Sequence, residues 1–225
     1  MTRMTEGDEG AGRRRLSADE RRSQILAAAR QLFIQEGVDN TSMRRIAQLA
    51  GVTPTLIYHH FADKAALMLS VCQEFFFGLM QASEEARRPR PEDADPLAPL
   101  GRLMAAYVRF GLENPDVYRL VFMTRIATLK RDGIIAGHRP RPDHQPHPED
   151  KGFGIQSFGI LEGEIRRLTE AGALRPNDPA ALAEMVWATG HGLVSLLITH
   201  GDFKWTPFDD LQRLAIDSLL RGIRR

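Results

Sequence analysis

The stretch GVTPTLIYHHF, residues 51–61, sets a glycine, a threonine and a proline ahead of a short run of apolar and aromatic residues. Gly51 can adopt a positive φ because it has no Cβ. Thr53 is a suitable N-cap, and Pro54 then takes the first helical position, where its missing N–H costs nothing. The stretch therefore predicts a sharp turn and a short helix that ends near Phe61.

A second short helix is predicted just before this turn. It begins near Ser42, with Thr41 as its cap, and runs to Ala50. Ala47, four residues before Gly51, is small enough for the next helix to cross close to it. Two capped helices with this spacing match a helix-turn-helix, which is a DNA-binding motif. An ordinary helical hairpin is the alternative, and the caps on both helices argue against it.

A longer helix is predicted ahead of this pair, from Asp19 to a stop signal at Gly37. Its apolar residues recur at spacings of three and four and so share one face: Ile25, Ala28, Ala29, Leu32 and Phe33. We expect Leu32 and Phe33 to form a small core with four residues of the next helices and the turn: Ile46, Ala50, Val52 and Ile57.

The rest of the chain also has helical spacing, and we find no run of strand alternation. The predicted fold class is all-α with about nine helices. The composition of the 225 residues, 43% hydrophobic and 26% charged, is typical of a globular protein. Beyond the first three helices, the predicted helices cover residues 63–87, 97–113, 115–129, 155–171, 178–200 and 207–224.

Charge is unevenly distributed along the chain. The formal net charge is only +1, which by itself does not indicate a nucleic-acid partner. Between residues 12 and 64, however, nine arginines and lysines stand against five acidic residues, a local net charge of +4. Phosphate binding is chiefly electrostatic, so this basic segment suits DNA. The cluster at Arg13–Arg15 lies in a polar arm that either solubilises the chain or touches nucleic acid.

A cytoplasmic protein without a membrane span is expected. The single cysteine, Cys72, cannot form a disulfide within the chain, which fits a reducing compartment. The N-terminal residues contain no apolar segment of a secretory signal. The most apolar stretch, Met185 to Ile198, is short for a membrane span and carries His191 in its middle.

The N-terminal pieces together resemble the TetR family of transcriptional regulators. The resemblance extends from about Arg22 to Leu67, through RRSQILAAARQLFIQEG, TSMRRIAQLAGVT, LIYHHF and DKAAL in that order. Three residues depart from the usual pattern: Arg45, Thr55 and Leu56. The polar, glycine-containing residues 1–18 predict a flexible arm. The resemblance implies a helix-turn-helix DNA-binding domain (19–64) and a helical ligand-binding and dimerisation domain (65–225).

The resemblance also implies how DNA is contacted. The helix that begins at Pro54 enters the major groove, and Arg44 matches a position that can reach a base, where arginine suits guanine. Tyr58, His60 and Lys64 match phosphate-contacting positions, and His59 sits at a variable position between two of them. Hydroxyl groups can hydrogen-bond phosphates as well. The predicted DNA-contacting residues are Thr41, Ser42, Arg44, Thr53, Pro54, Thr55, Leu56, Tyr58, His59, His60 and Lys64.

In the C-terminal part the resemblance implies a ligand cavity. WATGHG, with Trp187, His191 and Gly192, is similar to a domain type of the family that is named for its Trp-His-Gly residues. A packed aromatic beside a hydrogen-bonded core histidine is the competing interpretation. The candidate ligand-binding residues are Phe75, Phe76, Leu79, Met80, Tyr107, Phe110, Phe122, Trp187 and His191.

Dimerisation through the last two long helices is likewise implied. Their apolar residues are too many for one intramolecular face, which independently suggests a partner surface. The residues concerned are Leu182, Val186, Leu193, Leu196, Leu197, Leu211, Leu214, Ile216, Leu219 and Leu220.

The predicted function is a homodimeric, sequence-specific DNA-binding regulator, a repressor that reads a palindromic operator and is released by a small-molecule ligand. The alternative is a helical small-molecule-binding or scaffold protein without specific DNA binding. An enzyme is not expected, because KGFGIQSFG has Ser157 where a nucleotide-binding loop needs its third glycine. No metal or cofactor is expected: adjacent helical residues such as His59 and His60 point about 100° apart and do not readily share an ion.

Overall fold

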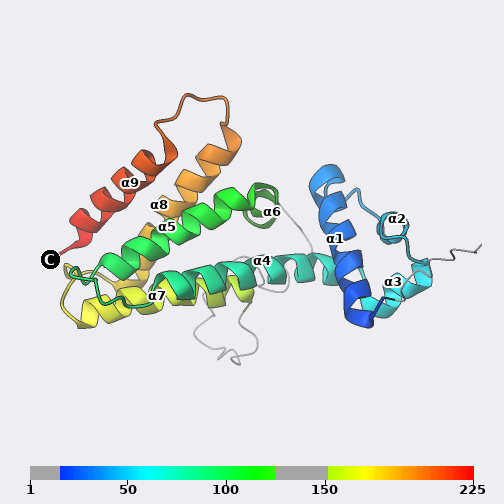
Figure 1. The fold of residues 1–225 in the computed structure, drawn as a ribbon, viewed down its shortest axis with the longest axis horizontal. Helices are drawn as coiled ribbons and strands as arrows, with labels where there is room; N and C mark the ends of the chain where they lie inside the picture. The colour runs from blue at the N-terminus through cyan, green and yellow to red at the C-terminus, as the bar shows by residue number, and fades with distance from the viewer. Residues whose placement is uncertain (1–15, 125–151) are drawn as a thin grey trace, which may run out of the picture.

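The computed structural model describes residues 16–124 and 152–225, and within these ranges it contains nine α-helices and no strand (Figure 1). The predicted all-α class is therefore confirmed. Residues 1–15 of the predicted arm and the far end of the helix predicted from Pro115 lie outside the described residues. The helices are α1 (Ala18–Glu36), α2 (Met43–Leu49), α3 (Pro54–His60), α4 (Lys64–Ala86), α5 (Ala98–Glu113), α6 (Pro115–Tyr118), α7 (Phe153–Glu170), α8 (Pro179–Thr199) and α9 (Phe208–Ile223), with a π-helical turn, η1 (Arg119–Met123), after α6.

The first three helices form a head at one end of the molecule (Figure 1). Gly37 and Gly51 both have positive φ, 81° and 61°, as the two turns require. Thr53 caps α3 through a hydrogen bond from the backbone N–H of Leu56 at 3.2 Å. The cap of α2 is Ser42, which accepts a hydrogen bond from the N–H of Arg45, so the predicted cap at Thr41 is wrong by one residue.

The predicted core of the head is confirmed. Ile46, Ala47, Ala50 and Ile57 are all buried, and Val52 packs against them. Leu32 and Phe33 belong to the same cluster, together with the other residues of the predicted α1 face. The turn between α2 and α3 is thus held by apolar contacts on its inner side, which leaves the outer side of both helices to solvent.

Helix α4 joins the head to the remaining helices and runs along the length of the molecule (Figure 1). Its N-cap is Asp63, whose carboxylate accepts from the N–H of Ala66 at 2.8 Å. Arg22 of α1 donates to the hydroxyl of Ser70 on α4 at 3.1 Å and lies over the ring of Phe61. One apolar cluster continues from α1 through α4 to α6 and α8, so the head shares its core with the C-terminal helices.

The C-terminal helices pack around α5, which contacts α4, α7, α8 and α9. A Cβ at Gly111 on α5 would come within 2.7 Å of Val194 on α8, so glycine allows these two helices to approach. A second apolar cluster lies between α5, α7, α8 and α9. By length and composition alone, α4 and α8 are long and apolar enough to cross a membrane; parts of both lie in these two clusters, as helices of a folded core do.

The apolar residues of α8 and α9 divide between the core and the surface. Leu182 and Val186 are buried within the chain, so the structure accounts for them without a partner. Leu196 is 47% exposed and Leu214 is 60% exposed. The other six residues of the predicted partner surface are half-buried. The surplus of apolar residues is therefore real but smaller than the sequence suggests.

Candidate DNA-binding surface and ligand cavity

The outer surface of the head gathers most of the predicted DNA-contacting residues. On α2 and its cap, Arg44 and Ser42 are exposed. On α3 and its cap, the exposed residues are Thr53, Pro54, Thr55, Tyr58 and His59, whereas Leu56 and His60 are half-buried. Tyr58 is 56% exposed, which is unusual for a large aromatic side chain and leaves its ring and hydroxyl open to a partner.

Ser42, Thr53 and Thr41 differ in what their hydroxyls can still do. Ser42 and Thr53 accept capping hydrogen bonds, and each retains an O–H that can donate to a phosphate. Thr41 is buried, and its O–H donates to the carbonyl of Gly37 at 2.8 Å. This placement gives Thr41 a packing role in the turn between α1 and α2.

Lys64 lies at the start of α4 and ties that helix to the head. Its ammonium donates to the carbonyls of Asp39 at 3.2 Å and Thr41 at 3.0 Å. An ammonium has three N–H donors, so one remains for a phosphate. Lys64 is therefore both a brace between α4 and the turn before α2 and a candidate phosphate contact.

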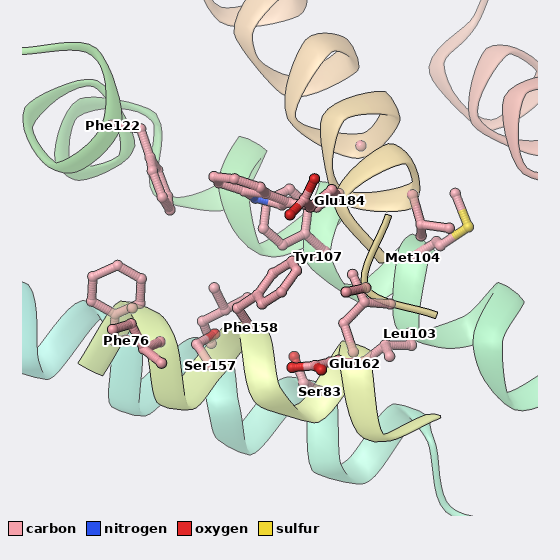
Figure 2. A pocket seen from close by; sticks show the side chains of 18 residues that line it. Phe76, Ser83, Leu103, Met104, Tyr107, Phe122, Ser157, Phe158, Glu162 and Glu184 are labelled. Carbon is pink, nitrogen blue, oxygen red and sulfur yellow. The ribbon is translucent and has the colours of Figure 1, made fainter. Parts of the chain in front are cut away.

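A cavity of about 470 Å³ lies among the C-terminal helices (Figure 2). Helices α4, α5, α7 and α8 surround it, and the π-helical turn η1 contributes Phe122. Its walls are mostly apolar and aromatic, with a few polar groups, as in sites for small organic molecules. The lining residues are Phe76, Leu79, Ser83, Leu103, Met104, Tyr107, Phe122, Gly154, Ile155, Ser157, Phe158, Leu161, Glu162, Ala180, Glu184, Val186, Trp187 and Gly190.

Comparison with known proteins assigns both the N-terminal and the C-terminal part of the chain to known domain families. Residues 25–71 match the family model described as bacterial regulatory proteins, tetR family. Residues 100–220, more than half of the chain, match the model described as the tetracyclin repressor-like C-terminal domain. The chain belongs to the TetR family.

The relatives of this TetR family protein include FasR, a transcriptional activator of Mycolicibacterium smegmatis, which is 34% identical over 115 residues. That match covers 50% of this chain and 51% of FasR, so the chain spans about half the length of that relative. RutR, a transcriptional regulator of Escherichia coli K12, is 27% identical over 189 residues, 83% of this chain and 80% of RutR.

Solved structures agree with this assignment. A protein of unknown function from Rhodococcus sp. RHA1 superposes with a TM-score of 0.68 at 26% identity, covering 96% of this chain and all of that one. The ketosteroid transcriptional regulator KstR2 of Mycobacterium tuberculosis superposes with a TM-score of 0.59 at 21% identity, covering 93% and 97%, and at that identity it supports the fold alone. The family models, together with this fold, make the protein a transcriptional regulator with a helix-turn-helix DNA-binding head and a helical C-terminal domain.

In this TetR family regulator the cavity includes five of the nine candidate ligand-binding residues: Phe76, Leu79, Tyr107, Phe122 and Trp187. Four candidates are not among the lining residues. Phe75 and Phe110 pack against each other with ring centroids 5.2 Å apart, and Met80 and His191 also lie outside the lining.

None of the ligand-binding residues predicted from the sequence lies on α7, although this helix lines the cavity. Ile155, Phe158, Leu161 and Glu162 all line it, at spacings of three and four along one helix face. The same spacing was visible in the sequence and predicts the helix. It does not indicate which neighbour the face meets.

His191 belongs to a hydrogen-bonded group beside the cavity. Its Nδ1 lies 2.5 Å from the hydroxyl of Tyr118, and that hydroxyl lies 2.9 Å from the hydroxyl of Tyr107. The indole N–H of Trp187 donates to the Tyr107 hydroxyl at 3.1 Å. This geometry matches the interpretation of a packed aromatic beside a hydrogen-bonded histidine. The hydrogen bonds also connect the cavity wall, at Tyr107 and Trp187, to Tyr118 on α6.

Burial lowers the pKa of His191 below its ordinary value of 6.5. Since the unfolded chain then binds more protons than the native state, stability is complete above about pH 6.5 and falls as the pH is lowered from there. We expect the melting temperature to decrease between pH 7.5 and pH 5.5, and His191→Gln to reduce this decrease. His200→Gln, at an exposed histidine on the end of α8, is the matched control and should leave it unchanged. An equal pH dependence in the His191 variant would contradict the assignment.

Proposed function

We propose that this protein is a cytoplasmic homodimer that represses transcription by binding a palindromic operator, and that a small molecule bound in the cavity releases it. The observation that carries the proposal is that one helix, α4, belongs to both sites. Its N-terminal end is braced to the head by Lys64 and by Ser70, the partner of Arg22. Further along, Phe76, Leu79 and Ser83 line the cavity.

The DNA-contacting side of the proposal rests on the exposed side chains of α2 and α3. Arg44 and the N-terminal residues of α3 supply the base-reading groups, and Tyr58, His60 and Lys64 supply phosphate contacts. Ser42 and Thr53 add hydroxyl donors to the phosphates. His59, exposed beside Tyr58, completes the set as a neighbour of the backbone or of a base. We exclude Thr41, because its hydroxyl is already used within the head.

The dimer follows from the requirements of a palindrome. Two recognition helices must lie about one DNA turn, roughly 34–36 Å, apart to read two half-sites. The exposed residues Leu196 on α8 and Leu214 on α9 lie on the two helices that we assign to the dimer interface. Ligand binding that shifts α4 in each subunit would change the separation of the two heads. A coupling free energy of about 1–3 kcal/mol is typical of such a switch.

Trp187, His191 and Gly192 are consistent with a C-terminal domain of the Trp-His-Gly type. Trp187 lines the cavity, and His191 holds Tyr118 behind it. In this interpretation Trp187 is part of the ligand site, and His191 positions Tyr118, whose hydroxyl contacts that of the lining residue Tyr107.

Sequence-specific DNA binding is tested with a duplex selected from a random pool by the purified protein. Fluorescence anisotropy then compares this duplex with a scrambled one between 50 and 200 mM salt. A regulator binds the selected duplex more tightly and loses affinity steeply as salt increases. A scaffold or ligand-binding protein shows neither a preference nor a steep salt dependence. Repression needs a separate test, because the relative FasR is named an activator. A reporter gene placed behind the selected site distinguishes the two: a repressor lowers its expression and an activator raises it.

Replacing Tyr58 should weaken DNA binding without changing sequence preference. The side chain is more than half exposed on α3, and a hydrogen bond from its hydroxyl to a charged phosphate is worth about 1.5–3 kcal/mol. We expect Tyr58→Phe to lower affinity for the selected and the scrambled duplex by the same factor. Tyr58→Ala should weaken both further. A loss confined to the selected duplex would identify Tyr58 as a base-reading residue instead.

A further inference from the structure

The cavity carries negative charge and no opposing positive charge in its described lining. Its charged lining residues are two glutamates, Glu162 on α7 and Glu184 on α8. Figure 2 shows the two carboxylates on opposite sides of the cavity. No lysine, arginine or histidine is among the described lining residues. An anionic ligand would therefore lose its hydration without gaining a cationic partner, which is unfavourable.

Each of the two glutamates stands one helical turn from an aromatic ring that also lines the cavity. Glu184 precedes Trp187 by three residues on α8, and Glu162 follows Phe158 by four residues on α7, spacings that share a helix face. The ring centroid of Trp187 lies 5.9 Å from that of Phe158 and 6.5 Å from that of Phe122. Aromatic faces attract cations, particularly the face of tryptophan.

The Glu162 carboxylate can be released to a ligand at small cost. Glu162 pairs with Arg166 at 2.9 Å, and the Arg166 side chain is largely exposed. An exposed pair of this kind contributes little to stability, so exchanging Arg166 for a ligand cation is inexpensive. Glu184 also interacts within the chain, and it is exposed at the cavity. The neighbouring acid Glu164 differs, because it is buried against Arg167 at 2.6 Å and is not a lining residue.

We propose that the effector of this cavity is an aromatic cation: a small molecule with one to three rings that carries an amine, amidine or quaternary ammonium group. The rings lie among Phe122, Phe158 and Trp187, and the positive charge lies between Glu162 and Glu184. The cavity volume of about 470 Å³ fits a molecule of this size. This inference rests on the proposed function of the cavity as the effector site.

The test uses three probes that share a naphthalene ring and differ in charge: trimethyl(2-naphthylmethyl)ammonium, 2-naphthylmethanol and 2-naphthylacetate. Binding to the full, DNA-free protein is measured by isothermal titration calorimetry. We expect the cation to bind at least about tenfold more tightly than the alcohol, and the anion to bind more weakly than the alcohol. In the double variant Glu162→Gln/Glu184→Gln, the advantage of the cation over the alcohol should decrease to less than about threefold.

Glu170→Gln is the matched control, because Glu170 lies on the same helix, is exposed and is not a lining residue. It should keep the full preference for the cation. The proposal is overturned if no probe binds, if the alcohol or the anion binds as tightly as the cation, or if the double variant keeps the preference. Equal melting temperatures of the variants show that the fold is intact. DNA binding is measured separately by anisotropy, so a failure of the regulator function and a failure of this ligand assignment give different results.

Discussion

Ile57→Ala should lower the free energy of unfolding by about 2–5 kcal/mol, the range for an isoleucine truncated in a packed core. Ile57 is the buried residue of the recognition helix, with 0% of its surface exposed. It packs in the same cluster as Ile46, Ala47 and Phe33, so its truncation leaves a cavity between α1, α2 and α3. The other side chains of α3 are exposed or half-buried, and none can replace this anchor.

The measurement is urea unfolding at a fixed protein concentration, followed by both circular dichroism and tryptophan fluorescence. Both tryptophans, Trp187 and Trp205, lie in the C-terminal part. Because one apolar cluster runs from α1 to α8, we expect both signals to move to lower urea together. His59→Ala, an exposed change two residues along α3, is the control and should alter stability by less than about 0.5 kcal/mol. A head that unfolds alone, without a shift in fluorescence, would show that the shared core does not couple the two parts.

Much of the head was predictable because its determinants are local. Gly51 is needed for a positive φ, Thr53 and Asp63 are side-chain caps, and each acts within three residues of its own position. Such signals can be interpreted without knowing the rest of the fold. The error at Thr41 arose where two adjacent hydroxyl residues are equally good caps. The Thr41 hydroxyl donates instead to the carbonyl of Gly37, four residues earlier, and this leaves Ser42 as the cap.

The cavity was only partly predictable, for a physical reason. Helical spacing identifies which residues share a face, but the partner of that face depends on how α5, α7 and α8 pack. Phe75 and Phe76 are neighbours on α4, yet only Phe76 lines the cavity. The place of the two glutamates in the cavity is not predictable from the sequence, because a charged residue on an amphipathic helix is normally solvated. Only their position beside Phe158 and Trp187 distinguishes them.

Arg44→Ala should relax sequence preference at one base pair of each half-site, by about 1–3 kcal/mol against the wrong base. Arg44 is exposed on the first turn of α2, on the outer side of the head. A guanidinium group pairs bidentately with the O6 and N7 acceptors of guanine, and no other base presents this pair of acceptors in the major groove. The effect is measured by binding the variant to selected duplexes that carry each of the four base pairs at every position of the half-site.

Arg45→Ala provides a matched control for that experiment, because it removes the same charge from the next residue. The guanidinium of Arg45 lies 3.5 Å from the carboxylate of Glu36, so part of its charge is already balanced within the head. We expect Arg45→Ala to change affinity modestly and equally for all duplexes. Arg44→Ala should instead lower the affinity for the preferred duplex and leave the others nearly unchanged. A uniform loss in both variants would mean that Arg44 contacts only phosphates, and base reading would then depend on the N-terminal residues of α3 alone.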